Sequence, residues 1–212
     1  GVLGFADLLA ETDLSSEQKE FVEAIQNSGN SLLSLINNIL DFSKLEAGEV
    51  TLEEQPVRLQ SVIEEALDTL STKAAEKGLE MTYLIDEAVP PVIETDETRL
   101  RQVLLNLLSN AVKFTDAGGT VHLHGHRLAD GRARLMVRDT GAGISQADIE
   151  RVLQPMHQSD ARISRDQDEG SGLGLAISRD LIELHGGTLH LDSSPGRGTT
   201  VTIELPRDSV AA

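Results

Sequence analysis

Apolar residues in the first fifty positions follow a helical period. Residues 1–11 are predicted to form the end of one helix, and Ser15 followed by Gln18 is the capping-box pattern that opens a second. The second helix is predicted to run to about Ala47, with Gly48 as its C-cap. Its apolar positions alternate at spacings of three and four residues, as in the seam of a helical bundle: Val22, Ile25, Gly29, Leu32, Ile36 and Ile39.

Two helices alone bury too little apolar surface to be stable. We therefore expect a partner hairpin from a second chain, giving a homodimer through residues 1–47. The alternative is that the stripe packs on the rest of this chain.

After Gly48 the pattern mixes strands with helices. Alternating apolar residues predict short strands at 50–52 and 81–85, on either side of a helix over about 60–77. Asp96 is predicted to cap a further helix, on which Asn106 and Asn110 lie one turn apart. The core stripe of that helix occupies a different face and consists of Leu100, Val103, Leu104, Leu107, Leu108 and Ala111.

The second half of the chain is predicted to contain a hairpin, two helices and two final strands. The expected positions are strands at 120–127 and 132–138, helices near 146–153 and from 173 onward, and strands near 189–191 and 201–205. The fold class is therefore α+β, with a helical hairpin over residues 1–48 followed by a domain of strands and helices over residues 49–212.

Composition narrows the class of protein. The chain has 212 residues, 39% of them hydrophobic, 25% charged and 2% aromatic, as in a soluble globular protein with an aliphatic core. No run approaches the roughly 20 apolar residues of a membrane span, so we expect no direct membrane contact in this segment. The absence of cysteine excludes disulfides and thiol catalysis, and a cytoplasmic location is expected, which includes the cytoplasmic part of a membrane-bound protein. The net charge of −17 argues against nucleic acid, though not against ATP.

Two glycine-rich motifs carry the candidate chemistry. They are Asp139-Thr-Gly141-Ala-Gly143-Ile144 and Gly170-Ser-Gly172-Leu173-Gly174-Leu175, and a helix is predicted to begin at the second. Glycine lets the backbone approach a ligand closely, and N–H groups at the start of a helix bind phosphate. A mobile loop is an equal interpretation of either motif alone.

Two further motifs give the set its specificity. Asn106-Leu-Leu-Ser-Asn110-Ala-Val-Lys113-Phe114-Thr115 precedes the glycine motifs, and Gly196-Arg-Gly198-Thr199 follows them. In this order and spacing the four resemble the N, G1, G2 and G3 boxes of sensor histidine kinases. Residues 11–49 are similar to the second dimerisation helix of that family, particularly of its hybrid members. The resemblance covers nearly the whole chain and implies a dimeric four-helix bundle followed by a two-layer α/β sandwich of the histidine kinase, Hsp90 and gyrase type.

The resemblance also implies ligands and roles. Asn110 matches the family's Mg²⁺ ligand, Asn106 a phosphate or water contact, and Asp139 the carboxylate that reads the adenine amino group of ATP. The implied nucleotide-binding set is Asn106, Asn110, Lys113, Phe114, Asp139, Gly141, Gly143, Ile144, Gly170, Gly172, Leu173, Gly174, Leu175 and Thr199. The plain alternatives are solvent exposure for the two asparagines and Lys113, core packing for Phe114, and ordinary turn or strand positions for Asp139 and Thr199.

The segment 153–172 resembles the ATP lid of the family. Leu153-Gln-Pro155-Met156 stands where the family often has Phe-x-Pro-Phe, so both phenylalanines are replaced. Arg162 and Arg165 are candidates for phosphate contacts, and a solvated loop is the alternative.

The histidines lie outside the predicted hairpin. The family transfers the ATP γ-phosphate to a histidine of its first hairpin helix and then to an aspartate of a response regulator receiver domain. Here the six histidines are His122, His124, His126, His157, His185 and His190. We therefore expect the acceptor just before Gly1, and expect this chain alone not to label itself. His122, His124 and His126 alternate on one strand and are predicted to face solvent rather than to bind zinc.

Three functions remain open at this point. The first is the kinase core, and the second is a non-catalytic module that dimerises and binds nucleotide. The third is an ATPase like gyrase and Hsp90, which usually carry a Glu base where Asn106 stands. Because an amide cannot take a proton from water, that residue favours the kinase.

Overall fold

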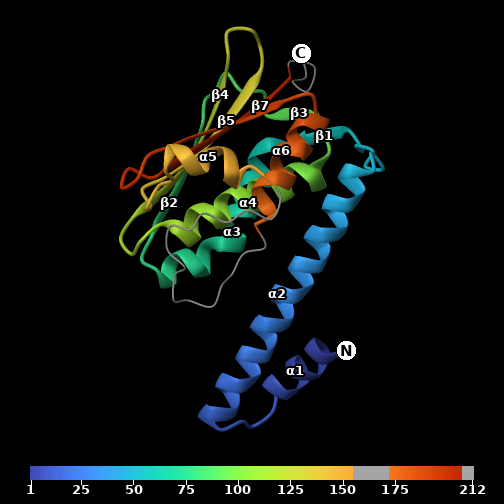
Figure 1. The fold of residues 1–212 in the computed structure, drawn as a ribbon, viewed down its shortest axis with the longest axis vertical. Coiled ribbons are helices and arrows are strands. Elements are labelled where there is room, and N and C mark those ends of the chain that lie inside the picture. The colour runs from blue at the N-terminus through green and yellow to red at the C-terminus, as the bar shows by residue number, and fades with distance from the viewer. Residues whose placement is uncertain (155–171, 207–212) are drawn as a thin grey trace.

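A helical hairpin and a mixed α/β domain make up the computed structural model, which describes residues 1–154 and 172–206. The hairpin consists of α1 (Val2–Ala10) and the long α2 (Ser16–Glu46). In Figure 1, α2 extends away from the domain and α1 folds back along its distal half. Within the described residues, no helix combines the length and the apolar character needed to cross a membrane.

The predicted capping box opens α2. Ser15 Oγ accepts a hydrogen bond from the Gln18 backbone N–H at 3.2 Å, and the Gln18 side chain accepts one from the Ser15 N–H at 2.9 Å. Gly29 lies where α1 crosses, because a Cβ there would lie 2.6 Å from Leu3 Cδ2. A glycine within the apolar stripe therefore allows the two helices to approach closely.

Most of the apolar stripe on α2 is not covered by the described residues. Phe21 is 60% exposed, Leu32 58% and Ile36 42%, whereas Val22 is buried. Within residues 1–154 and 172–206, packing on this chain therefore does not account for the stripe. The end of α2 contacts the second domain, where Phe42 and Leu45 pack against the domain core.

A polar contact accompanies this apolar one. Asp41, in the last turns of α2, forms an ion pair with Arg99 at 3.5 Å and accepts a hydrogen bond from Gln102 Nε2 at 2.8 Å. Both partners lie in the first turns of α4 (Glu97–Phe114). The hairpin is thus joined to the domain at the N-terminal end of α4.

The domain contains a five-stranded sheet and a two-stranded one. The larger sheet has the order β2 (Glu80–Ile85), β4 (Thr120–Arg127), β5 (Ala133–Asp139), β7 (Thr199–Leu205) and β6 (Thr188–Ser193). The β2–β4 pair is parallel and the other pairs are antiparallel. The smaller sheet pairs β1 (Gln55–Arg58) with β3 (Val92–Thr95).

Three helices cover one face of the larger sheet, namely α3 (Leu59–Glu76), α4 and α6 (Gly174–Leu184) (Figure 1). Their inward side chains form one core with the alternate residues of the strands, including Leu104, Ile177 and Leu123. The short α5 (Gln146–Val152) follows the first glycine motif. His122, on the opposite face of β4, is exposed, and His124 and His126 are half-buried.

The structure corrects one predicted strand. Residues 50–54 have no regular structure, and β1 begins later, at Gln55. Its partner β3 follows the Pro90-Pro91 break directly and was not predicted. Each strand has only four residues, and their register, Val57 opposite Ile93, depends on the tertiary fold rather than on local alternation.

Candidate functional site

The C-terminus of α4 and the loop after β5 are in close contact. The Ala142 N–H donates to the Phe114 carbonyl at 3.2 Å. A Cβ at Gly141 would lie 2.2 Å from the same carbonyl oxygen, so a larger residue there would force the loop away. The first glycine motif is therefore held against the last turn of the helix that carries Asn106 and Asn110.

The first and last glycine motifs also contact each other. The Gly196 N–H donates to the Ala142 carbonyl at 2.7 Å. Gly143 has φ +70°, and a Cβ there would lie 2.0 Å from the Ser194 carbonyl oxygen. Gly198 has φ +81°, and its Cβ would lie 2.0 Å from the Asp139 carbonyl oxygen. Both positions combine left-handed backbone with contact too close for any side chain.

Asp139 is the charged group at the centre of these loops. It is 7% exposed, and its Oδ1 accepts hydrogen bonds from the Gly141 N–H at 2.8 Å and the Thr199 N–H at 3.1 Å. Burial raises the pKa of Asp139, and these two backbone hydrogen bonds oppose that rise. Within the described residues both hydrogen bonds go to Oδ1, so Oδ2 can accept a hydrogen bond from a ligand.

Ser193 was not predicted from the sequence, yet it joins the loops. Its buried hydroxyl donates to the Gly198 carbonyl at 2.9 Å and accepts from the Ile144 N–H at 2.8 Å. It also lies 2.9 Å from Thr199 Oγ1, which acts as the donor because Ser193 has a single hydroxyl proton. A serine at the end of a strand carries no sequence signal for this role.

Asn106 connects α4 to the start of α6. Its Nδ2 donates to the Gly174 carbonyl at 3.3 Å and to Ser178 Oγ at 3.4 Å. The Ser178 hydroxyl, also not predicted, donates to the Gly174 carbonyl at 2.8 Å. The residue before α6 is Leu173, whose apolar side chain is buried and cannot cap the helix. The start of α6 thus lies beside Asn106, and its first N–H groups receive no cap from the Leu173 side chain.

The remaining predicted residues differ in how far their side chains are buried. Phe114 is 56% exposed, so it does not pack in the core, and Lys113 Nζ lies 5.5 Å from the centre of its ring. Asn110 is half-buried one turn after Asn106. Ile144 and Leu175 are partly buried and pack against the core.

Several predicted positions lie outside the described residues. They are Gly170 of the second glycine motif, together with Pro155, Met156, His157, Arg162 and Arg165 of the segment that resembles a lid. Among the described motif residues, the structure brings the first and last glycine motifs together around Asp139 and places Gly174 of the second beside Asn106.

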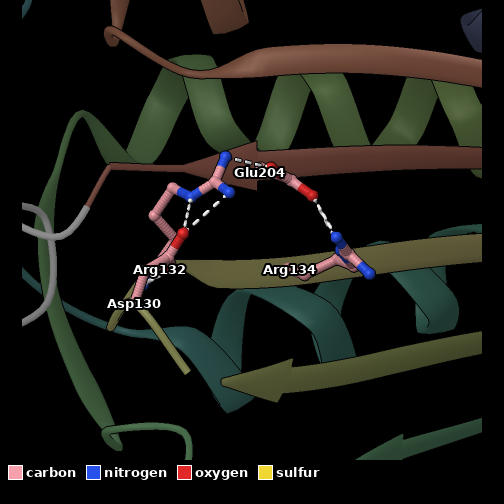
Figure 2. Close-up of polar contacts among 4 residues, drawn as sticks. All are labelled: Asp130, Arg132, Arg134 and Glu204. Atoms are coloured by element: carbon pink, nitrogen blue, oxygen red, sulfur yellow. Dashed lines mark hydrogen bonds and ion pairs between the residues drawn. The ribbon is translucent and has the colours of Figure 1, made fainter. Parts of the chain in front are cut away.

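A hollow of about 280 Å³ lies at the opposite end of β5. Figure 2 shows Arg132 between Asp130 and Glu204, with Arg134 on the other side of Glu204. The hydrogen bond from Arg132 Nε to Asp130 Oδ2 is 2.8 Å long, as is the one from Arg134 Nε to Glu204 Oε1. These charges compensate one another across β5 and β7, so we assign the hollow a structural role and place the functional site at the glycine motifs.

Comparison with known families agrees with this geometry. Residues 95–209 match the family described as histidine kinase-, DNA gyrase B- and HSP90-like ATPase, and residues 1–48 match the His Kinase A (phospho-acceptor) domain. The chain therefore belongs to the histidine kinase-, DNA gyrase B- and HSP90-like ATPase family. It thus combines the phospho-acceptor and ATPase domain types that these two matches describe.

Individual relatives point the same way. The chain is 40% identical to the sensor protein GacS of Pseudomonas syringae pv. syringae over 98% of its length, which is 23% of that relative. It is 39% identical to the histidine-protein kinase BarA of Escherichia coli (strain K12), with the same two coverages. Among solved structures, full-length ShkA in complex with AMPPNP matches this chain with 37% identity and a TM-score of 0.82. The match covers 100% of this chain and 43% of the ShkA chain. The chain thus spans about a quarter of the length of these curated relatives.

Proposed function

We propose that this chain is the ATP-binding kinase core of a two-component sensor histidine kinase. In this proposal the ATP γ-phosphate is transferred to a histidine and from there to an aspartate of a response regulator receiver domain. The observation that carries the proposal is the buried Asp139 carboxylate. Two glycine motifs hold its Oδ1, and its Oδ2 is left as an acceptor.

The adenine end of the ligand is assigned to this carboxylate. The exocyclic amine of adenine donates hydrogen bonds, whereas the equivalent position of guanine is an acceptor, so a fixed carboxylate selects ATP over GTP. Thr199 supports the carboxylate through its N–H, and Gly141 and Gly143 let the loop beside it pack closely against the Phe114 and Ser194 carbonyls. Phe114, exposed at the edge of these loops, is assigned to contact the nucleotide.

The phosphate end is assigned to α4 and the start of α6. Asn106, Asn110 and Lys113 lie on the last turns of α4, and Gly172 and Gly174 flank the start of α6. Asn110 would hold Mg²⁺ through its amide oxygen, a hard ligand of the kind Mg²⁺ prefers, and the ion would neutralise phosphate charge. The Asn106 amide donates to Gly174 and Ser178, which suits a positioning group and not a base.

The proposed phosphate transfer also requires an acceptor histidine. None of the six histidines lies in residues 1–48, and His185 is buried, with its Nδ1 at 2.7 Å from the Leu181 carbonyl. The acceptor histidine of the proposed reaction is therefore not among these 212 residues. The exposed stripe on α2 supports dimerisation through residues 1–47. The cytoplasmic location stays a prediction.

Binding and turnover together test the proposal. Calorimetry should show Mg²⁺-dependent binding of AMPPNP to the 212-residue chain. With radiolabelled ATP the chain alone should acquire no acid-labile label, because it lacks the acceptor. A separately supplied hairpin bearing the family's acceptor histidine should acquire that label.

Two outcomes would favour the other functions. Steady release of inorganic phosphate without histidine labelling would indicate a hydrolase like gyrase or Hsp90. Nucleotide binding with neither labelling nor phosphate release would indicate a non-catalytic module. Failure to bind AMPPNP would contradict all three.

A further inference from the structure

We infer that Lys77 is a positioning residue for the nucleotide site. The effect of Lys77 on nucleotide binding rests on the proposed function, whereas its contacts with α4 do not depend on that function. Lys77 follows α3 directly and lies between the two segments that match known families, residues 1–48 and 95–209. Neither the motifs nor the family matches therefore assign it a role.

The C-terminus of α4 explains what Lys77 does. The last four carbonyl groups of a helix have no partner within the helix and must be satisfied from outside. Lys77 Nζ donates to the Lys113 carbonyl at 2.8 Å and to the Val112 carbonyl at 3.0 Å, and it lies 3.4 Å from the Thr115 carbonyl. One ammonium group thus satisfies two of the four terminal carbonyls and the first one beyond the helix.

The other two terminal carbonyls have separate partners. The Thr115 hydroxyl donates to the Ala111 carbonyl at 2.6 Å, and the Ala142 N–H donates to the Phe114 carbonyl at 3.2 Å. The last turn of α4 is therefore fixed by three groups: its own capping threonine, Lys77 from α3, and the first glycine motif. The glycine motif depends on this helix end for one of its backbone hydrogen bonds.

Lysine suits this position for two reasons. An ammonium group has three donors that can reach three carbonyls converging on one point. Its positive charge also interacts favourably with the negative end of the α4 dipole. Its own backbone is also held, because the Lys77 N–H donates to the Lys73 carbonyl at 3.3 Å and the Leu79 N–H donates to the Ala74 carbonyl at 2.9 Å. The side chain consequently starts from a fixed point at the end of α3.

The last turn of α4 carries residues that are assigned to the nucleotide. Asn110 and Lys113, assigned to Mg²⁺ and phosphate, lie in or next to this turn, and Phe114 ends it. The Phe114 carbonyl in turn holds the loop that contains Gly141, next to Asp139. Lys77 thus fixes the phosphate end of the site relative to its adenine end without touching the ligand.

The test replaces Lys77 by Met, which keeps the stem and removes the donors and the charge. Lys73→Met is the matched control, because it removes an exposed lysine from the last turn of α3, four residues before Lys77. We expect Lys77→Met to weaken Mg·AMPPNP binding about tenfold, the scale of one lost hydrogen bond to a charged group. Lys77→Arg should restore part of the affinity, because a planar fork keeps the charge but cannot reach all three carbonyls equally.

Amide hydrogen exchange, followed without nucleotide, separates positioning from general destabilisation. In Lys77→Met the Ala142 amide should exchange faster, while the amide of Leu104, in the middle of α4, should keep its protection. Equal acceleration at both amides, or an unchanged Ala142 amide with unchanged AMPPNP affinity, would overturn the inference. If the wild-type chain fails to bind AMPPNP, the proposed function fails, and the exchange rate of Ala142 still decides whether Lys77 holds the loop.

Discussion

Replacing Asp139 by Asn tests the adenine assignment with little change of shape. The Asn carbonyl oxygen can take the place of Oδ1 and accept from the Gly141 and Thr199 N–H groups, which keeps the two glycine motifs in place. The amide nitrogen then occupies the position of Oδ2. It would present a donor to the adenine amine, which is also a donor.

The magnitude follows from the hydrogen bond that is lost. A hydrogen bond to a charged group contributes about 1.5–3 kcal/mol, so we expect the affinity for Mg·AMPPNP to fall by about 10-fold to 150-fold. Calorimetry on Asp139→Asn measures this loss directly. Asp192→Asn is the matched control, because it makes the same charge change at an exposed position on β6 and should leave affinity unchanged.

The thermal stability of Asp139→Asn should not fall with its affinity for AMPPNP. Because burial raises the pKa of Asp139, the folded state binds a proton more readily than the unfolded state does. This group therefore favours folding at low pH, and the contribution is lost as the pH rises from the ordinary aspartate pKa through the raised one. At neutral pH the ionised side chain costs stability, so Asp139→Asn should unfold at the same temperature as wild type or higher. Unchanged AMPPNP affinity in this variant would refute the assignment, and a lowered unfolding temperature would contradict the electrostatic argument.

Two further predictions concern the glycine motif and the hairpin. Gly198→Ala should lower stability by about 1–3 kcal/mol and abolish AMPPNP binding, because its Cβ would lie 2.0 Å from the Asp139 carbonyl oxygen. Gly196→Ala, with a similar positive φ but no atom within 4 Å of its Cβ, should retain binding in the same titration, and equal loss in both variants would contradict this account. Leu32→Glu should reduce the mass measured by light scattering from two chains to one, because Leu32 is 58% exposed on the stripe of α2. Leu84→Glu, at a site 60% exposed on β2, should leave the two-chain mass intact, whereas a wild-type monomer at high concentration would argue against the dimer.

The sequence predicted the elements whose signals are local. The cap of α4 is one example, because the Asp96 side chain accepts from the Arg99 N–H at 3.0 Å as its position before the apolar stripe predicts. The capping box at Ser15 is another. The grouping of Asn106 with the glycine motifs was predicted through the family resemblance, since residues so far apart in sequence share no local pattern.

Contacts that depend on the tertiary fold were not predicted. Ser193 accepts a hydrogen bond from the Ile144 N–H and Lys77 donates one to the Lys113 carbonyl, and neither residue type signals such a contact with a distant segment. The pair β1–β3 was missed for a related reason, because four-residue strands carry too little alternation to show their register. Phe114 could not be placed from its type alone, since an aromatic residue at the end of a helix can face the core or the solvent.

The connectivity of the larger sheet also determines when the site can form during folding. The β4–β5 hairpin closes locally. In contrast, β5 can pair with β7 only after the long segment between them, which carries the first and second glycine motifs, has closed into a loop. Contacts of such sequence separation form late, because the entropy of closing the segment must be lost first. A nucleotide bound at the Asp139 carboxylate would therefore stabilise contacts that are absent from the transition state for folding. Such a ligand acts on the rate of unfolding and leaves the rate of folding unchanged.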